Sequence, residues 1–235
     1  MLPESNLSDP SLLTKSSSSK PPTEILPGIF AFAPNRDTLG GTAYLIVTPT
    51  ENILIDSPAW NDVNRQFIVD RGNPNWLVIT HRGGIGQTTT IATKLGCEVI
   101  IQEQEAYLLP ELKVTTFQHK FNLNDSIHAI WTPGHSPGSS CLYYAGAGGV
   151  LFTGRHLLPN QLGAAVPLRT PKTFHWLRQL RSVEAIWQHF PAQQPLHHIC
   201  PGANTGLLRG QGSILVDSQL SIAIDRSNHW ANTSH

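Results

Sequence analysis

A series of short apolar segments, separated by turns that contain glycine or proline, constrains the fold of this chain more than any other feature of its sequence. The segments TAYLIVTPT and NILIDSP flank one such turn and predict a β-hairpin. The runs NWLVIT (75–80) and CEVIIQ (97–102) are apolar, as is typical of strands buried on both faces. Helices are predicted over 61–70 and in the segment that ends at Gly96. The first half of the chain is therefore expected to alternate strand and helix.

The second half returns to strands and contains one long predicted helix. Strands are predicted in VTTFQ, SIHAIWTPG, SSCLYYAG, GVLFTGR and LHHICPG, with SILVD and LSIAID closing the sheet. The segment 171–190 begins with a proline and has a helical apolar stripe. That stripe consists of Phe174, Leu177, Leu180, Val183 and Ile186. Two strand-rich halves, each with helices, predict an α+β fold in which two sheets pack face to face under outer helices.

Composition indicates where the folded domain begins. Residues 1–24 are rich in serine, proline and lysine and contain few large apolar side chains, so they are predicted to be a disordered tail. A transit peptide is a less favoured alternative, because Glu4 and Asp9 are untypical of such peptides. Residues 25–235 have the length of one domain.

The charge balance and the cysteines limit the classes of partner. With 16 Lys and Arg against 16 Asp and Glu, the chain has no net charge, which disfavours a nucleic-acid-binding protein. The sequence has neither a membrane-length apolar run nor a signal-peptide pattern, so no membrane partner is expected. Three cysteines without a C-x-x-C pair favour a reducing compartment, and the cytoplasm is the predicted location. The 11 histidines are a surplus, and imidazole is a common metal ligand.

Polar, charged or small residues follow five of the predicted strands at the point where each strand ends. These residues are Asp56 after NILI, His81 after WLVIT, His135 after AIWTPG, Arg155 after LFTG, and Ala203 in CPGANTG. Strand ends in α/β architectures are where side chains converge on a crevice. The sequence therefore predicts one site built from all five ends.

The series IDSP, VITH, TPGHSPGS, LFTGR and CPGANTG, in that order, resembles the metallo-β-lactamase superfamily, in particular its glyoxalase-II-like members. The strongest element is TPGHSPGS, and the resemblance extends over nearly the whole chain from about residue 26. It implies a four-layer αββα sandwich. It also implies a dinuclear zinc or iron centre that activates a hydroxide for hydrolysis.

The positions that this resemblance assigns to metal ligands are mostly occupied by other residues. Only His81 and His135 are retained, whereas the lost ligand positions hold Gly83, Ile85, Gly86, Arg155 and Ala203. A catalytic zinc normally has about three protein ligands and a water. Arg155 stands where the superfamily has a bridging aspartate, and a guanidinium is a permanent cation. No metal or other cofactor is therefore expected, and Arg155 is predicted to fill the vacated position, where it would pair with Asp56. The alternative is an arginine that points into solvent.

The altered motif HRGGIGQTTT offers a second way to bind an anion. Gly83, Gly84 and Gly86 precede a predicted helix, so their N–H groups are candidates for an anion-binding turn, with Arg82 adding positive charge. The alternative, that these glycines only fill space left by lost ligands, carries equal weight.

The function predicted from these residues is non-hydrolytic binding of an acidic small molecule or a protein partner in a cationic cleft. The predicted ligand-binding residues are Asp56, His81, Arg82, Gly83, Gly84, Gly86, His135 and Arg155. The main alternative is a hydrolase with a single zinc or iron, held by His81, His135 and a third donor such as Asp56 or His156. Whether the protein is an enzyme, and its oligomeric state, are left open.

Two further interpretations carry less weight. Ser136, Ser139 and Ser140 lie next to His135, but no G-x-S-x-G elbow is present, and a structural turn is favoured over a nucleophile. Trp176 and Trp187 on the long helix are candidates for an interface, although core packing is preferred for both. At least one of His197 and His198 is expected to be a structural histidine with a hydrogen-bond partner.

Overall fold

The first half of the chain forms a sheet of seven strands. In the computed structural model, which describes residues 20–189 and 195–216, these strands lie in sequence order across the sheet. They are β1 (Thr23–Leu26), β2 (Ile29–Ala31), β3 (Tyr44–Val47), β4 (Asn52–Ile55), β5 (Trp76–Ile79), β6 (Glu98–Gln102) and β7 (Val114–Phe117). Strands β1 to β4 are antiparallel, and β4 to β7 are parallel. The predicted hairpin is the β3–β4 pair, in which Val47 lies opposite Asn52.

The second half forms a sheet of six strands in the order β15-β14-β11-β10-β9-β8. Their bounds are β8 (Lys120–Asn122), β9 (Ile127–Trp131), β10 (Ser140–Tyr144), β11 (Val150–Gly154), β14 (His198–Pro201) and β15 (Ile214–Leu215). Only the β11–β14 pair is parallel among these, because the long helix connects the two strands. A separate pair, β12 (Leu158–Pro159) and β13 (Ala165–Val166), follows β11.

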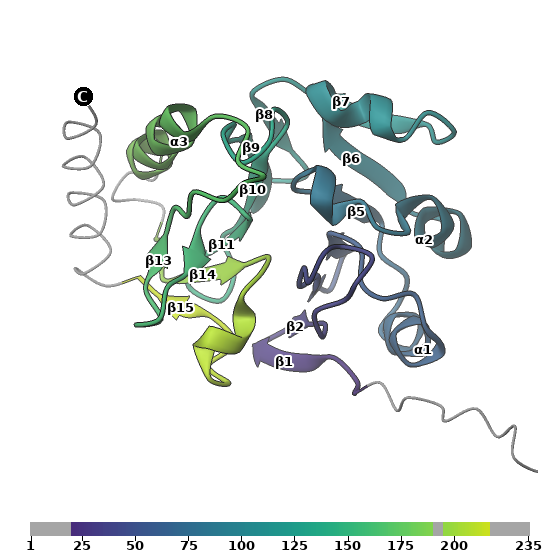
Figure 1. Cartoon of the computed structure of the whole chain (residues 1–235). Helices are drawn as coiled ribbons and strands as arrows, with labels where there is room; N and C mark the ends of the chain where they lie inside the picture. Colours follow the sequence, from purple (N-terminus) through teal and green to yellow (C-terminus); the bar gives the residue numbers. More distant parts are fainter. Residues whose placement is uncertain (1–19, 190–194, 217–235) are drawn as a thin grey trace, which may run out of the picture.

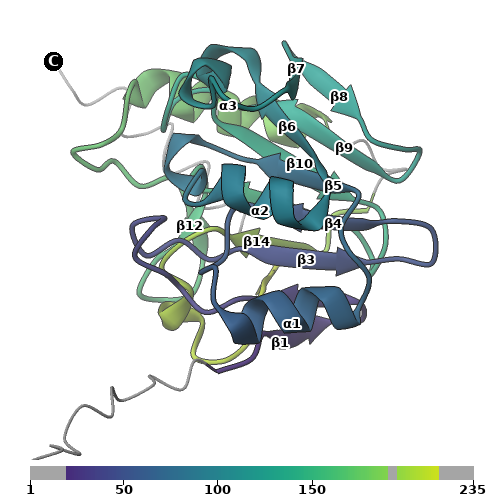
Figure 2. The same cartoon turned by 90° about the vertical axis from the view of Figure 1, so that its right-hand side faces the viewer.

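Helices cover the outer faces of both sheets, as Figure 1 shows. Helix α1 (Asp62–Asp70) begins where the Asn61 side chain accepts a hydrogen bond from the Asn64 N–H, and α2 (Thr88–Leu95) ends at Gly96 in a left-handed conformation. Both lie on the first sheet (Figure 2), and α3 (Trp176–His189) lies on the second. The short 3-10 helices are η1 (Arg82–Gly84), η2 (Glu103–Leu108) and η3 (Thr205–Leu208).

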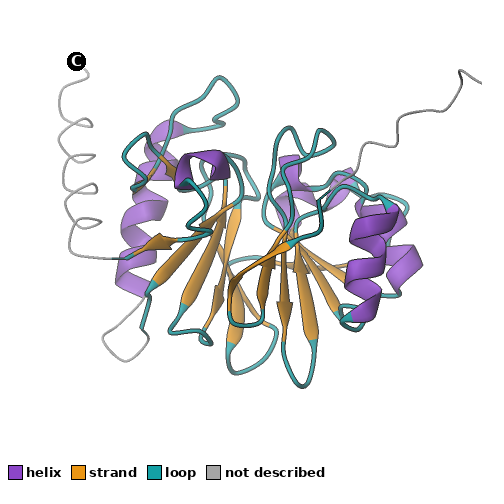
Figure 3. Ribbon diagram, turned by 90° about the horizontal axis from the view of Figure 1, so that it is seen from below, coloured by secondary structure: helices purple, strands orange, loops and turns teal. Residues whose placement is uncertain are grey.

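Three apolar layers hold these elements together. The central layer joins the facing sheets, with Ile55 and Val78 from the first packed in the same cluster as Leu142 and Phe152 from the second. The other two layers lie between each sheet and its own helices. Figure 3 shows the resulting order of helix, sheet, sheet and helix. The predicted α+β fold, a four-layer αββα sandwich, is confirmed.

The ends of the chain and the long helix differ from the prediction in detail. Thr23 and Glu24 belong to β1 rather than to the tail, whereas most of the tail and the LSIAID segment lie outside the described residues. Helix α3 begins at Trp176, because the N–H groups of Phe174 and His175 donate instead to the carbonyls of His135 and Gly134.

The predicted apolar stripe of α3 is only partly buried. Val183 and Ile186 are 1% exposed, whereas Phe174 is 56% and Leu177 is 49% exposed. The apolar stripe predicted from the helical spacing is therefore buried at Val183 and Ile186 but not at Phe174 and Leu177. Trp176 is partly buried, and the Trp187 side chain lies outside the described part of the chain.

No helix in residues 20–189 and 195–216 combines the length and the apolar character that a membrane-spanning segment needs.

Candidate functional site

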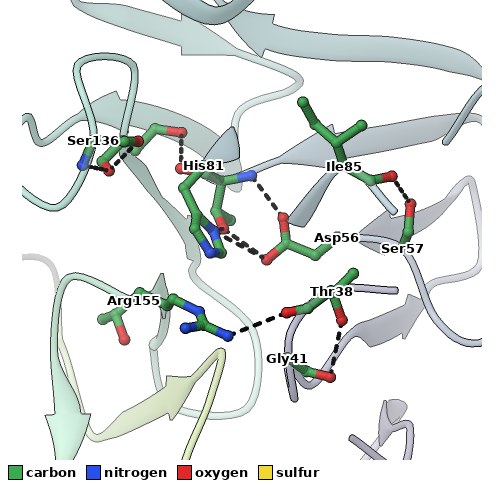
Figure 4. Close-up of polar contacts among 12 residues, drawn as sticks. Thr38, Gly41, Asp56, Ser57, His81, Ile85, Ser136 and Arg155 are labelled. Atoms are coloured by element: carbon green, nitrogen blue, oxygen red, sulfur yellow. Dashed lines mark hydrogen bonds and ion pairs between the residues drawn. The ribbon is translucent and has the colours of Figure 1, made fainter. Parts of the chain in front are cut away.

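The ends of β4, β5 and β11 and the turn after β9 meet at one edge of the two sheets (Figure 4). The Ser140 N–H donates to the Thr80 carbonyl at 2.8 Å and so ties the second sheet to the first. The rings of His81 and His135 lie with their centroids 5.3 Å apart, one from each sheet. The structure thus brings Asp56, His81, His135 and Arg155 into one neighbourhood, with the backbone of the two sheets as the scaffold.

Asp56 is the centre of a closed hydrogen-bond network. It lies directly after β4 with a φ of 56°, and its Oδ1 accepts from the Thr80 N–H at 2.8 Å. Its Oδ2 accepts from the Thr80 hydroxyl at 2.6 Å. Burial raises the pKa of Asp56 to about 6, and the hydrogen bonds from Thr80 and the charge of Arg155 oppose that rise. Asp56 therefore holds the Thr80–His81 turn in place and has both of its oxygens engaged.

The same network fixes the protonation of the His81 ring. The Thr80 hydroxyl has a single proton, which it donates to Asp56, and its oxygen lies 3.0 Å from His81 Nδ1. Nδ1 is then the donor in that contact, and Nε2 carries the lone pair. His81 is 2% exposed, and its Nε2 has no hydrogen-bond partner among the described residues. Desolvation, followed by the proximity of His135 and Arg155, lowers the pKa of His81 well below its usual value.

The three glycines of the altered motif differ in their surroundings. A Cβ on Gly84 would lie 2.2 Å from Asp56 Oδ1, so only glycine lets the carboxylate approach this closely. The Gly84 N–H already donates to the His81 carbonyl, and Gly86 packs against Ser57 and Thr38. Gly83 alone of the three lines the pocket described below. The predicted anion-binding turn is therefore not formed by these glycines together, because they serve close packing.

Arg155 follows β11 and reaches across to the loop formed by residues 35–41. Its Nη2 donates to the Thr38 carbonyl at 3.1 Å, as Figure 4 shows. The same nitrogen donates to the Leu39 carbonyl at 2.6 Å. Asp56 and Arg155 influence each other's pKa, yet the guanidinium makes no ion pair with that carboxylate within the described part of the chain. The predicted pairing with Asp56 is thus replaced by contacts of Arg155 with the Thr38 and Leu39 carbonyls.

Two more histidines are kept neutral near Arg155. The pKa of His135 is lowered to about 4 by burial and then by the charges of Arg155, Arg82 and Lys172. The pKa of His156 is lowered to about 3 by burial and by His135. His156 is 1% exposed, and both of its ring nitrogens lack a partner among the described residues, although its carbonyl accepts from Gln179 Nε2 at 2.9 Å. Positive charge at the site therefore comes from arginine and lysine.

Glu105 is a site residue that the sequence did not indicate. It belongs to η2, it is fully buried, and its Oε1 accepts from Arg82 Nε at 3.1 Å. Its Oε2 has no partner among the described residues, and Gly138 lies so close that a Cβ there would be 2.7 Å from the Glu105 side chain. No motif marked Glu105, because its role depends on a contact with a residue 23 positions earlier.

A pocket of about 430 Å³ opens beside these residues. Its cationic lining residues are Arg82, Arg155 and Lys172, and its apolar ones are Leu39, Pro171 and Phe174. Gly83, His135, Ser136 and Thr173 complete the lining. No Asp or Glu of residues 20–189 and 195–216 lines it. Lys172 and Phe174 were not predicted for the site, and only their position before α3 brings them there.

The donor set does not fit the metal centre that the fold family implies. Among the described residues, no group of three or more His, Cys, Asp and Glu side chains is placed to hold a metal ion. Gly83, Gly86 and the buried Ala203 have no donor atoms, and Arg155 brings a positive charge next to His81 and His135. The single-metal arrangement with Asp56 or His156 as third ligand is not assembled either.

The serines beside His135 form a turn. Ser139 Oγ accepts from the Ser136 N–H and lies 2.8 Å from Ser136 Oγ, and the Ser139 N–H donates to the Ser136 carbonyl. These contacts support the predicted structural role. His198 also has the expected partner, since its Nδ1 lies 3.1 Å from Ser213 Oγ.

Comparisons with known proteins agree with this fold. Residues 99–188 match the sequence profile of the metallo-β-lactamase superfamily. No curated protein matches the sequence. The matched segment contains His135 and Arg155, whereas His81 lies before it.

Several solved structures share the fold at low sequence identity. The BLEG-1 B3 metallo-β-lactamase is 18% identical, with 75% of this chain and 91% of that chain covered and a TM-score of 0.59. An archaeal metallo-β-lactamase superfamily protein from Sulfolobus tokodaii is 13% identical, with 88% and 87% covered and a TM-score of 0.57. A metallo-β-lactamase from Cronobacter sakazakii with a HARLDQ motif is 17% identical, with 91% and 96% covered and a TM-score of 0.58. These likenesses establish the architecture, and the residues of the site must carry any functional conclusion.

Proposed function

We propose that this chain, which has the metallo-β-lactamase fold and matches the superfamily's sequence profile over residues 99–188, binds an acidic ligand beside Arg155 instead of hydrolysing a substrate with a metal-activated water. The observation that carries this proposal is that Arg155, at the position where the resemblance implies a ligand aspartate, lines a pocket together with two other cations, Arg82 and Lys172. A guanidinium repels a divalent metal ion and attracts an anion. The exchange therefore favours a negatively charged group where the superfamily holds a positive one.

The charges around the pocket support an anionic ligand. Glu105 is paired with Arg82, but it does not line the cavity, so no carboxylate of the described residues competes there for Arg155 or Lys172. His135 and His81 are held neutral and do not add charge. A carboxylate or phosphate group is the ligand chemistry that such a pocket selects. A protein partner would have to present the same chemistry through an acidic side chain.

The experiment is isothermal titration of inorganic phosphate at low salt into the purified chain and into Arg155→Met and Lys172→Met variants. Both variants should bind phosphate at least about tenfold more weakly, because each loses a charge-assisted contact. Lys94→Met is the matched control, since Lys94 is exposed on α2 and does not line the pocket. Lys172 is exposed, so its variant is expected to fold even if Arg155→Met does not. Phosphate affinity equal in all four proteins would contradict the proposal.

A hydrolase with one metal ion is the second candidate. Two observations favour it: His81 Nε2 carries a lone pair without a partner among the described residues, and His135 lies next to the His81 ring. The third ligand would have to come from water or substrate, because no third His, Cys, Asp or Glu of the described residues is placed with them to hold a metal ion. Elemental analysis of protein purified without chelator or metal-binding tag distinguishes the two candidates. Near-stoichiometric zinc or iron that disappears in the His81→Ala, His135→Ala double variant would replace the proposed anion-binding function by this one.

A further inference from the structure

The pocket beside Arg155 has walls of two chemical kinds. Its lining includes the charged side chains of Arg82, Arg155 and Lys172 together with the apolar side chains of Leu39 and Phe174. Leu39 is 57% exposed and Phe174 is 56% exposed, so neither contributes mainly to the core. Large apolar side chains left in water at the edge of a cavity are typical of ligand-binding sites.

Hydrogen bonds to the main-chain groups of Leu39 and Phe174 hold both apolar residues in place next to the cationic ones. Arg155 donates to the Leu39 carbonyl at 2.6 Å, and the Phe174 N–H donates to the His135 carbonyl at 3.0 Å. Leu39 has a φ of 56°, a left-handed conformation that costs free energy in a residue other than glycine. The chain therefore keeps an apolar side chain in a strained, exposed position that core packing does not explain.

From this juxtaposition we propose that the ligand is amphipathic, with an acidic head group attached to an apolar chain or ring. The head group contacts Arg155 and Lys172, and the apolar part lies against Leu39 and Phe174. A volume of about 430 Å³ is sufficient for a small molecule of this kind, since ligand pockets span about 300–1,000 Å³. This inference rests on the proposed function, because it requires the same pocket to be the binding site.

The test is isothermal titration of the full-length chain with inorganic phosphate, butyl phosphate, hexyl phosphate below its micelle concentration, and hexan-1-ol. Affinity should rise about twofold to fourfold for each methylene buried, and the neutral alcohol should bind far more weakly than hexyl phosphate. Phe174→Ala and Leu39→Asn should remove most of the gain from chain length, and asparagine tolerates the left-handed conformation of position 39. Leu162→Ala is the matched control, because Leu162 is 92% exposed and does not line the pocket.

The outcomes separate this inference from the proposed function. Hexyl phosphate that binds no more tightly than inorganic phosphate would overturn the amphipathic ligand and leave an anion site. Absence of binding by every phosphate compound would overturn both. Binding to phosphatidic acid vesicles without binding to hexyl phosphate would also overturn the inference, because the source of the head group would then be a membrane surface. A chain-length gain that persists in both Phe174→Ala and Leu39→Asn would remove these residues from the site.

Discussion

The two sides of the site differ in whether their polar groups are already paired or face an open pocket. On the side of the first sheet, Asp56, Thr80 and Gly84 form a buried network in which the carboxylate oxygens and the Gly84 N–H are already paired. On the side of the second sheet, Arg155 and His135 line an open pocket. The difference shows that hydrogen bonding and the close approach that Gly84 permits close one part of the site, whereas Arg155, a large cation at a lost ligand position, lines an open cavity.

The largest expected effect tests the closed side. Gly84→Ala should destabilise the protein by about 3 kcal/mol or more, because the new Cβ would lie 2.2 Å from Asp56 Oδ1 in a fully packed region. Urea unfolding measures the change. Gly206→Ala is the control, since nothing lies within 4 Å of a Cβ at that position. Equal, small effects for both variants would mean that Asp56 does not pack against Gly84.

Acid stability tests the buried histidines of the site. The histidines of the site have folded-state pKa values below the usual 6.5, so their contribution to the stability of the folded state is complete above pH 6.5. This stability is lost as the pH falls, towards about 4 for His135 and about 3 for His156, and His81 acts in the same direction. Asp56 has the opposite effect, because its raised pKa means that the folded state favours the protonated carboxyl. The stability that this protonation contributes is lost as the pH rises through about 6. The three histidines outweigh the one aspartate, and we expect net destabilisation on acidification.

His156→Leu isolates one of these terms. Between pH 6.5 and about 4.5, the free energy of unfolding of the variant should fall by about 3 kcal/mol less than that of the natural chain. The reason is that each pH unit below the ordinary pKa costs a buried neutral histidine about 1.4 kcal/mol. At pH 7 the change should be neutral or stabilising, since two unpaired ring nitrogens leave the interior. Urea unfolding at both pH values, with exposed His119→Leu as control, measures this. Identical acid profiles for His156→Leu and the natural chain would show that His156 is not buried as a neutral ring.

The smallest expected effect concerns the Arg82–Glu105 pair at the boundary between the two sides. Arg82→Gln leaves the buried Glu105 carboxylate without its cation and should cost about 1–2 kcal/mol. This is less than for a fully buried pair, because the Arg82 side chain is 45% exposed. The Arg82→Gln, Glu105→Gln double variant should recover part of that loss. A coupling energy near zero in the double-mutant cycle would mean that the pair contributes nothing to stability.

The sequence by itself determined the sandwich and the identity of the changed ligand positions. Strands such as NILI, WLVI and VLFTG are apolar because sheets buried on both faces require it, and that signal is local. Residues at strand ends, such as Asp56 and Arg155, could be assigned to one edge from the same pattern. Gly96 likewise ends α2 as its position indicated.

Only the tertiary structure decided how those residues are used. Arg155 binds the main-chain carbonyls of Thr38 and Leu39, more than a hundred positions earlier, and a carbonyl acceptor leaves no mark in the sequence. Phe174 fits a helical apolar stripe, yet hydrogen bonding to the His135 turn keeps it outside α3 and exposes it at the pocket. The spacing of apolar residues in the sequence indicates which side chains are buried locally. Hydrogen bonds between residues far apart in the sequence depend instead on how the two sheets pack together, and this packing assembles the site.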